Sequence, residues 1–118
     1  MVTLHVPLTP QTRHLIGAAE LAAMKPTATL VNTARGPIVD QAALVAALRS
    51  GRLHSAGLDV FDREPLGDDL AGLADVPGLV MLPHVGSATA DTRGAMVDVA
   101  VDNILAVLDG RAALTPVT

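Results

Sequence analysis

Short apolar segments alternate with longer stretches of mixed polarity along most of the chain, and this alternation predicts an α/β fold. Each of the apolar segments ends abruptly at proline, glycine or a charged residue, as a buried strand does where it opens into a turn. The predicted strands are residues 1–6, 28–35, 56–60 and 79–82. If all of them are parallel, their carboxyl ends meet at one edge of an open sheet, which is where such sheets bind ligands.

The stretches between the strands, and the last part of the chain, show apolar residues at helical spacing. Residues 11–24 contain two short helical patterns that are separated at Gly17. Asp40 is the expected N-cap of a helix that ends at Gly51. The longest predicted helix covers residues 91–109, and one face of it consists of Met96, Val99, Ala100, Ile104, Val107 and Leu108.

Two segments lack a clear period. Residues 62–78 are acidic and rich in glycine and proline, which predicts an ordered loop with room for a helical turn, anchored by Leu66, Leu70 and Leu73. The tail at residues 112–118 is expected to be loose. The chain therefore predicts one α/β domain with a parallel sheet of about four strands, flanking helices and a long C-terminal helix.

Composition narrows the possible functions. One aromatic residue, Phe61, is too few for stacking on bases, and a net charge of -4 with eight Lys and Arg residues disfavours binding to nucleic acid. The chain has no cysteine, which excludes disulfides and thiolate zinc sites and fits a reducing cytoplasm. Since no apolar run reaches the ~20 residues that cross a bilayer, we expect a soluble cytoplasmic protein with no membrane partner. No HExxH, CxxC, P-loop or GxSxG motif is present, so no metal site is expected.

Arg35 stands where the second predicted strand ends, so its guanidinium is expected to project over the edge of the sheet. Its planar set of donors can bind a carboxylate through two hydrogen bonds. The alternative is an arginine that pairs with an acidic residue at the surface, where an ion pair contributes little to stability. The position alone leaves both interpretations open.

Glu64 and His84 follow two other predicted strands, and their separation in the sequence does not establish contact. If they meet, the carboxylate would stabilise the imidazolium and determine which ring nitrogen carries the proton. Such a histidine can act as a general acid. The alternatives are a loop histidine at the surface and a solvated carboxylate in an acidic loop.

Four further residues could bear on function. Asp59 falls inside an apolar strand, so its carboxylate must be hydrogen-bonded or must face a ligand. His5 has the corresponding place in the first strand, where a structural role is favoured over ligand binding. Gly86 and Ser87 precede the last helix and could offer backbone amides to an anion, although a single glycine is a weak signal.

Six sequence blocks, in order and over nearly the whole chain, resemble the C-terminal half of D-isomer-specific 2-hydroxyacid dehydrogenases. The blocks are HVPLTPQTRHLI at residues 5–16, MKPTA at 24–28, NTARGPIVD at 32–40, AL at 43–44, GLDVFDREP at 57–65 and PHVGSAT at 83–89. Six spaced blocks are far more specific than any single motif. In overall texture the chain is most similar to the glyoxylate/hydroxypyruvate reductase branch of the family.

The resemblance implies an NAD(P)-dependent oxidoreductase that transfers a hydride between the nicotinamide and a small 2-keto or 2-hydroxy acid, with a homodimer as the full-length protein. Arg35 matches the arginine that binds the substrate carboxylate and keto oxygen, Glu64 the acid that pairs with the histidine, and His84 the proton donor and acceptor. Asp59 matches the carboxylate that contacts the nicotinamide amide group. The other positions that match cofactor contacts are His5, Val6, Pro7, Thr12, Thr33, Ala34, Arg35, His84, Gly86 and Ser87.

The chain departs from the family in what it lacks. It contains no GxGxxG motif and no charged residue after a second strand to bind the adenosine ribose. Residues 1–118 therefore resemble the C-terminal part of a dinucleotide-binding domain, a partial doubly wound sheet of the Rossmann type. The upstream GxGxxG half and most of the substrate domain are absent, and we expect little or no activity from this fragment alone.

Two other functions stay open at this point. Domains of this fold can serve as non-catalytic cofactor-sensing or protein-binding modules, although such a module needs no aligned arginine, acid and histidine. The chain could also be a remnant that folds poorly, with exposed sheet edges where other strands should pair.

Overall fold

The computed structural model describes residues 1–67 and 69–117. They form two units, Met1–Val85 and Gly86–Thr118, which we describe one at a time. The helices of the first unit are α1 (Ala18–Ala23), the short 3-10 helix η1 (Gly36–Ile38), α2 (Gln41–Arg49) and α3 (Asp69–Ala74). The second unit contains α4 (Ala90–Leu108).

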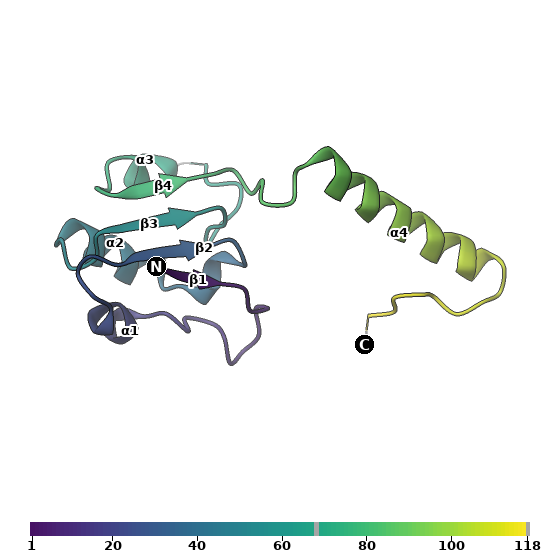
Figure 1. Ribbon diagram of the computed structural model, residues 1–118, viewed down its shortest axis with the longest axis horizontal. Coiled ribbons are helices and arrows are strands. Elements are labelled where there is room, and N and C mark those ends of the chain that lie inside the picture. The colour runs from purple at the N-terminus through teal and green to yellow at the C-terminus, as the bar shows by residue number, and fades with distance from the viewer. Residues whose placement is uncertain (68, 118) are drawn as a thin grey trace. The chain divides into compact units, whose positions relative to one another are not determined.

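The first unit is built on a sheet of parallel strands in the order β1-β2-β3-β4, which confirms the predicted fold class (Figure 1). The strands are β1 (Val2–Leu4), β2 (Thr29–Asn32), β3 (Ser55–Leu58) and β4 (Leu79–Met81). The strands are shorter than predicted, and they stop before His5, Arg35, Asp59 and His84. These polar residues therefore lie in the loops that follow the strands.

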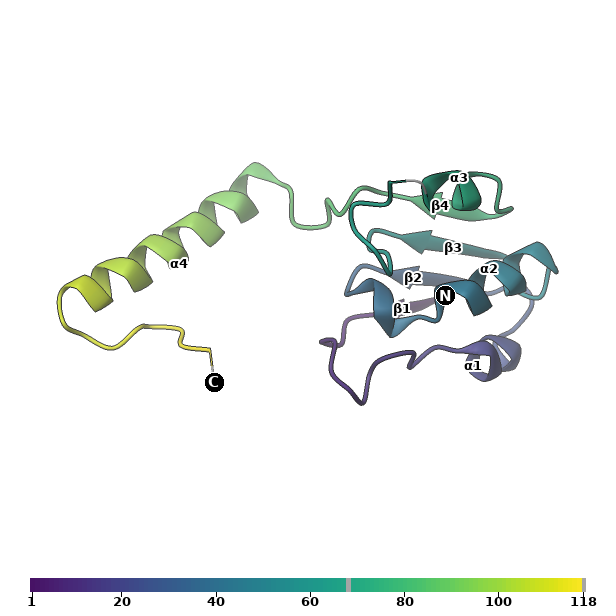
Figure 2. The ribbon, with the colours of Figure 1, turned by 180° about the vertical axis from the view of Figure 1, so that it is seen from behind.

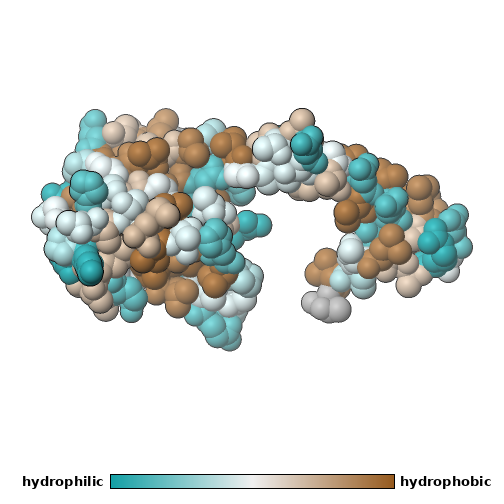
Figure 3. Space-filling model, in the orientation of Figure 1, coloured by the Kyte–Doolittle hydropathy of each residue, from teal (hydrophilic) through white to brown (hydrophobic). Residues whose placement is uncertain are grey.

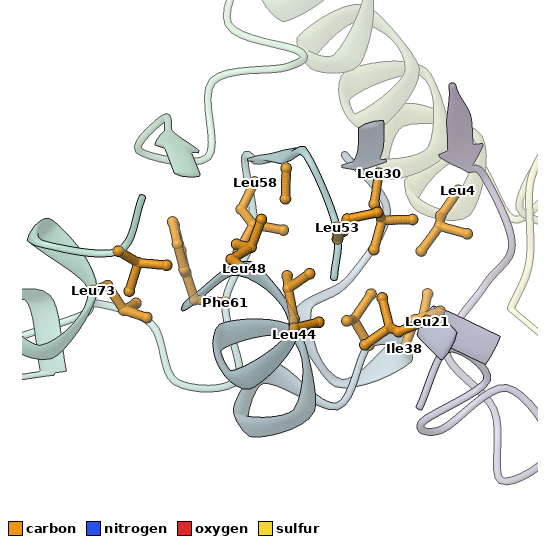
Figure 4. Packing of buried hydrophobic residues seen from close by; sticks show 14 residues of the cluster. Leu4, Leu21, Leu30, Ile38, Leu44, Leu48, Leu53, Leu58, Phe61 and Leu73 are labelled. Atoms are coloured by element: carbon orange, nitrogen blue, oxygen red, sulfur yellow. The ribbon is translucent and has the colours of Figure 1, made fainter. Parts of the chain in front are cut away.

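One face of this sheet carries the core. The strand register places Leu4, Leu30, Ala56 and Leu58 on that face, and all of them are buried. Figures 1 and 2 show from opposite sides that α2 lies over the sheet, and α1 packs against α2. Figure 4 shows the leucine side chains of the helices gathered against those of the strands, with Phe61 beside them. The core is aliphatic apart from Phe61, as the composition requires.

The ends of α2 agree with the sequence-based prediction. The Asp40 carboxylate accepts a hydrogen bond from the amide of Ala43 at 3.0 Å, which satisfies one of the free amides at the start of the helix. Gly51 follows the last turn with a φ of 69°, a left-handed conformation that glycine adopts without strain. Local capping chemistry is therefore sufficient to define this helix.

The prediction of two helical stretches in residues 11–24 is wrong for the first of them. The second forms α1, which starts after Gly17 with the Glu20 carboxylate accepting from the Gly17 amide. The first is held against η1 instead, because the amides of His14 and Ile16 donate to the main-chain carbonyls of Pro37 and Ile38 in that helix. A tertiary pairing overrides the local helical pattern here.

The acidic segment at 62–78 contains a longer helix than the single turn expected. Leu73 of α3 is buried together with Val76, whereas Leu70, one of the predicted anchors, is 47% exposed. Residue 68 of this segment lies outside the described residues. Among the residues that the structure does describe, no helix has the length and apolar character needed to cross a membrane.

The second unit confirms the long helix but not a buried face. α4 begins after Thr89, whose hydroxyl accepts from the Thr92 amide. The residues predicted to form an apolar face are largely exposed, up to 77% for Leu108, and Figure 3 shows apolar side chains along this helix. The tail is not loose where it is described, since Asn103 makes two hydrogen bonds to Thr115, at 2.9 and 3.0 Å. Thr118 lies outside the described residues.

Candidate active site

The parallel strands all point the same way, so the loops that follow them lie along one edge of the sheet (Figure 1). Arg35 follows β2, Glu64 follows β3 and His84 follows β4. Residues that are far apart in the sequence therefore share this edge. It is the edge at which open α/β sheets bind their ligands.

Glu64 and His84 are in direct contact. The Nδ1 of His84 and the Oε2 of Glu64 are 2.6 Å apart, and the other carboxylate oxygen accepts from the Phe61 amide at 2.8 Å. A carboxylate at Nδ1 favours the proton on that nitrogen and leaves Nε2 for other chemistry. The side chains are 47% exposed for His84 and 33% for Glu64, so the imidazole is accessible from solvent.

The surroundings of Glu64 favour its ionised form. Partial burial by itself would raise the pKa of Glu64, but hydrogen bonds from His84 and from the Phe61 amide, with the positive charges of His84 and Arg35, lower the pKa below its ordinary value. The carboxylate therefore stays charged at neutral pH. It can hold the imidazole in one orientation.

Gly36 brings the loops after β2 and β3 together. A Cβ at this position would lie 1.9 Å from the carbonyl oxygen of Phe61 and 2.6 Å from the amide nitrogen of Asp62, so no larger residue fits. The main chain next to Arg35 thus packs directly on the main chain that leads to Glu64. The two loops are therefore neighbours, and the positive charge of Arg35 is the smallest of the influences that lower the pKa of Glu64.

Arg35 lines a different hollow from the pair. Its Nη1 donates to the carbonyl of Ala34 at 2.6 Å. The hollow has a volume of about 610 Å³ and is lined by Arg35, His5, Val6, Pro7, Leu8, Thr33 and Ala34. Glu64 and His84 line a second, mainly apolar hollow of about 690 Å³, with Phe61, Pro65, Leu66, Leu70, Met81, Leu82 and Pro83. The structure therefore joins two of the candidate catalytic residues directly and the third only through its charge.

The carboxylate of Asp59 is 3% exposed, and its Oδ1 accepts from the Val85 amide at 2.8 Å. Asp59 lies directly after β3, and not inside the strand as predicted, but its buried carboxylate has the hydrogen bond that was expected. The bond ties the end of β3 to the residue after His84. Asn32, which is completely buried at the end of β2, was not among the predicted site residues. A polar residue at the end of an apolar strand is the signal that could have found it.

The remaining cofactor candidates fall into three groups. His5, Val6, Pro7, Thr33 and Ala34 line the hollow of Arg35. His5 is exposed, with Nε2 2.9 Å from the Thr3 hydroxyl, so it is not a buried structural histidine. Thr12 stabilises the loop that follows β1, since its hydroxyl donates to the Pro7 carbonyl at 2.7 Å. Gly86 and Ser87 begin the second unit, and their contact with a cofactor stays a prediction.

These features define a class of protein: an open parallel α/β domain of the Rossmann type, with hollows at the carboxyl ends of its strands and a histidine–carboxylate pair on the same edge. Among the residues that the structure describes, no group of three or more His, Cys, Asp or Glu side chains could hold a metal ion.

Comparison with known proteins narrows this class. Residues 1–86 match the family described as D-isomer specific 2-hydroxyacid dehydrogenase, NAD binding domain. Glyoxylate/hydroxypyruvate reductase B of Citrobacter koseri is 53% identical over 110 residues, which cover 93% of this chain and 34% of that protein. The NADPH-dependent glyoxylate/hydroxypyruvate reductase of Sinorhizobium meliloti, solved with NADP and malonate, is 44% identical with a TM-score of 0.90, over 98% of this chain and 36% of its own. D-lactate dehydrogenase of Lactobacillus jensenii, solved with NAD+, is 31% identical with a TM-score of 0.87, and the match covers 98% of this chain and 38% of that enzyme.

The chain belongs to the family of D-isomer specific 2-hydroxyacid dehydrogenases, a family of NAD(P)-dependent oxidoreductases, and its residues 1–86 match the NAD-binding domain of that family. It spans about a third of the length of the curated relatives that it matches.

Replacement of Gly36 by alanine should disrupt the site. The new Cβ would force the Phe61–Asp62 main chain to move, so we expect Gly36→Ala to lower the free energy of unfolding by about 1–3 kcal/mol or more and to break the contact between Glu64 and His84. Urea unfolding measures the first effect, and the imidazole ¹⁵N chemical shifts of His84 measure the second. Gly72→Ala is the matched control, since a Cβ at that helical glycine meets nothing within 4 Å. Equal behaviour of the two variants would show that the close approach is not needed.

The stability of the chain should depend on Glu64 at acidic pH. Because the pKa of Glu64 is lower in the folded chain than in the unfolded chain, the unfolded chain binds more protons between the two values. The stabilisation is therefore fully present above the ordinary value of 4.5 and is lost as the pH falls through the folded value. Urea unfolding at a series of pH values should show a steeper loss of stability for the unmodified chain than for Glu64→Gln. Parallel profiles would contradict this prediction.

Proposed function

We propose that this chain carries the proton-transfer and carboxylate-binding residues of an NAD(P)-dependent reductase that acts on a small 2-keto acid such as glyoxylate or hydroxypyruvate. The observation that carries the proposal is the 2.6 Å contact between His84 Nδ1 and Glu64 Oε2 at the ligand-binding edge of the sheet. The family match and the reductases named above support it.

In this proposal His84 is the general acid of the reduction. Its Nε2 donates a proton to the keto oxygen as the substrate becomes an alkoxide, and the same nitrogen accepts the proton in the reverse reaction. Glu64 holds the ring through Nδ1 and stabilises the imidazolium form. The ionised state of Glu64 suits this role, since a neutral carboxyl group would not compensate the charge on the ring.

Arg35 is proposed to bind the carboxylate of the 2-keto acid and to polarise its keto oxygen. A guanidinium offers two parallel hydrogen bonds to a carboxylate, and its charge stabilises the alkoxide that forms in the reaction. Its side chain already lies at the edge of a hollow and close enough to Glu64 to affect its charge. If the loops of Arg35 and His84 move toward each other when a substrate binds, then Arg35 and the Glu64–His84 pair would act on the same substrate molecule.

The residues around the hollow of Arg35 fit a nicotinamide cofactor. The hollow, of about 610 Å³, lies at the carboxyl ends of β1 and β2, where dinucleotides bind in sheets of this type. We propose that the His5–Pro7 and Thr33–Arg35 segments hold NAD or NADP there, with Asp59, Gly86 and Ser87 as further contacts. The bound nicotinamide supplies or takes up the hydride.

The proposal extends to the larger protein. We propose that residues 1–118 form the C-terminal part of a dinucleotide-binding domain, that the whole protein is a homodimer, and that the isolated chain has little or no activity. The hydrogen-bonded pair supports an enzyme over a non-catalytic module, because a module that only binds cofactor or protein has no use for a charged carboxylate on an exposed imidazole.

The proposal is tested in a chimera in which this chain replaces the matching third of the Citrobacter koseri reductase. Oxidation of NADPH or NADH with glyoxylate or hydroxypyruvate is followed, with the isolated chain as the baseline. We expect His84→Gln to lower kcat by about 10²- to 10⁴-fold, as the loss of general acid catalysis does. The exposed His54 gives the matched control, His54→Gln, which should keep the full rate. An unchanged kcat in the His84 variant would remove this residue from the mechanism.

Arg35→Lys keeps the charge but loses the planar pair of donors. In the same chimera we expect kcat/KM for glyoxylate to fall by about ten- to a hundredfold, the order set by one hydrogen bond to a charged group. Arg111→Lys is the control, since Arg111 pairs with Asp109 at the surface and its side chain is 59% exposed. If both variants keep the same kcat/KM, Arg35 does not bind the substrate through its guanidinium geometry.

A further inference from the structure

Two polar side chains are buried among the described residues, Asn32 and Asp59, which are 0% and 3% exposed. A buried polar group destabilises the fold unless it is hydrogen-bonded. Apolar packing alone does not explain why these two residues are polar. Their hydrogen-bond partners indicate their role.

Asn32 spans the turn that carries Arg35. Its side-chain oxygen accepts from the amide of Ala34 at 3.0 Å, and its side-chain nitrogen donates to the carbonyl of Arg35 at 2.9 Å. The amide thus takes up one main-chain donor and one main-chain acceptor of a turn that leaves the sheet. These two hydrogen bonds hold the main chain from which the Arg35 side chain extends.

Asp59 continues the same network to the loop of His84. Its amide donates to the main-chain carbonyl of Asn32 at 3.0 Å, and its carboxylate accepts from the Val85 amide at 2.8 Å. Val85 directly follows His84, which has a φ of 55°, an unusual conformation for a residue other than glycine. A fixed amide at Val85 helps to hold His84 in that conformation.

We propose that Asn32 and Asp59 form one positioning unit, in which Asn32 orients Arg35, Asp59 orients His84, and the hydrogen bond between their main chains sets the two loops relative to each other. The inference rests on the proposed function in so far as Arg35 and His84 are the groups to be oriented. It assigns a role to Asn32, and it gives Asp59 a role in addition to contact with the cofactor.

The test is amide hydrogen exchange in the 118-residue chain, without cofactor or substrate. Asn32→Ala should speed exchange at Ala34 by about tenfold, the order expected for the loss of one hydrogen bond, with smaller increases at Asp59 and Val85. Asn32→Asp keeps the oxygen that accepts from Ala34 and should restore protection there. This variant also keeps the test valid if the alanine variant does not fold. Thr29→Val is the matched control, since it removes the hydroxyl contact to Ser55 at the other end of the same strand pair.

The second half of the unit is tested at position 59. Asp59→Ala should speed exchange at Val85 and shift the ¹⁵N signal of His84 Nδ1, whereas Asp59→Asn retains an acceptor and should restore both. A purely structural role would instead speed exchange over the whole sheet and leave the imidazole signal in place.

The exchange rates are first corrected for global unfolding. The positioning role is overturned if the Asn32 variants then raise the amide exchange rates of Ala34, Asp59 and Val85 no more than Thr29→Val does. It is also overturned if Asp59→Ala leaves Val85 and the His84 ring unchanged. These measurements involve no turnover, so a negative result for His84→Gln in the chimera would reject the proposed function and leave the positioning result standing. If His84→Gln abolishes activity in the chimera, but the Asn32 and Asp59 variants speed amide exchange equally over the whole sheet, the positioning role alone is rejected.

Discussion

The contact between the main chain at Gly36 and the main chain at Phe61 is the constraint on which the site depends. Parallel pairing brings β2 and β3 together, but it leaves the loops beyond them free to diverge. The missing side chain at Gly36 lets the two loops touch, with no room even for a Cβ. Because of this contact, the guanidinium that follows β2 lies close enough to the carboxylate that follows β3 to help keep it ionised. This charge adds to the larger effect of the hydrogen bonds from His84 and from the Phe61 amide, which lower the pKa of Glu64 most.

The distribution of polar groups in the first unit follows the same logic. Its core is built from leucine, valine, isoleucine and alanine, which pack without needing hydrogen bonds. Among the described residues, the buried polar side chains are Asn32 and Asp59, which lie at the carboxyl ends of β2 and β3, where a main-chain hydrogen bond joins the two loops. A low-dielectric core strengthens hydrogen bonds of this kind, and it makes their loss costly. The sheet therefore holds the loops in place more firmly than solvent-exposed contacts would.

Much of the fold could be predicted because the signals were local. The strands follow from short apolar runs, and the start of α2 follows from one carboxylate at Asp40. Predictions failed where tertiary contacts decide: residues 11–16 pair with η1 instead of forming a helix, and the tail folds back through Asn103 and Thr115. The face of α4 was predicted correctly as a helical pattern, but periodicity reports only which residues share a face and does not supply the surface that would cover it.

The site shows the limit of sequence reasoning more sharply. Glu64 and His84 are 20 residues apart, and no periodicity connects a residue after β3 with one after β4. Only the parallel order of the strands makes their contact possible, so the residues could be named as candidates but not joined. Asn32 was missed for the opposite reason: it continues an apolar strand and looks like part of the turn. The strand register shows that the Asn32 side chain faces the core. A buried amide in an apolar core needs hydrogen-bond partners, and the two main-chain groups at Ala34 and Arg35 provide them.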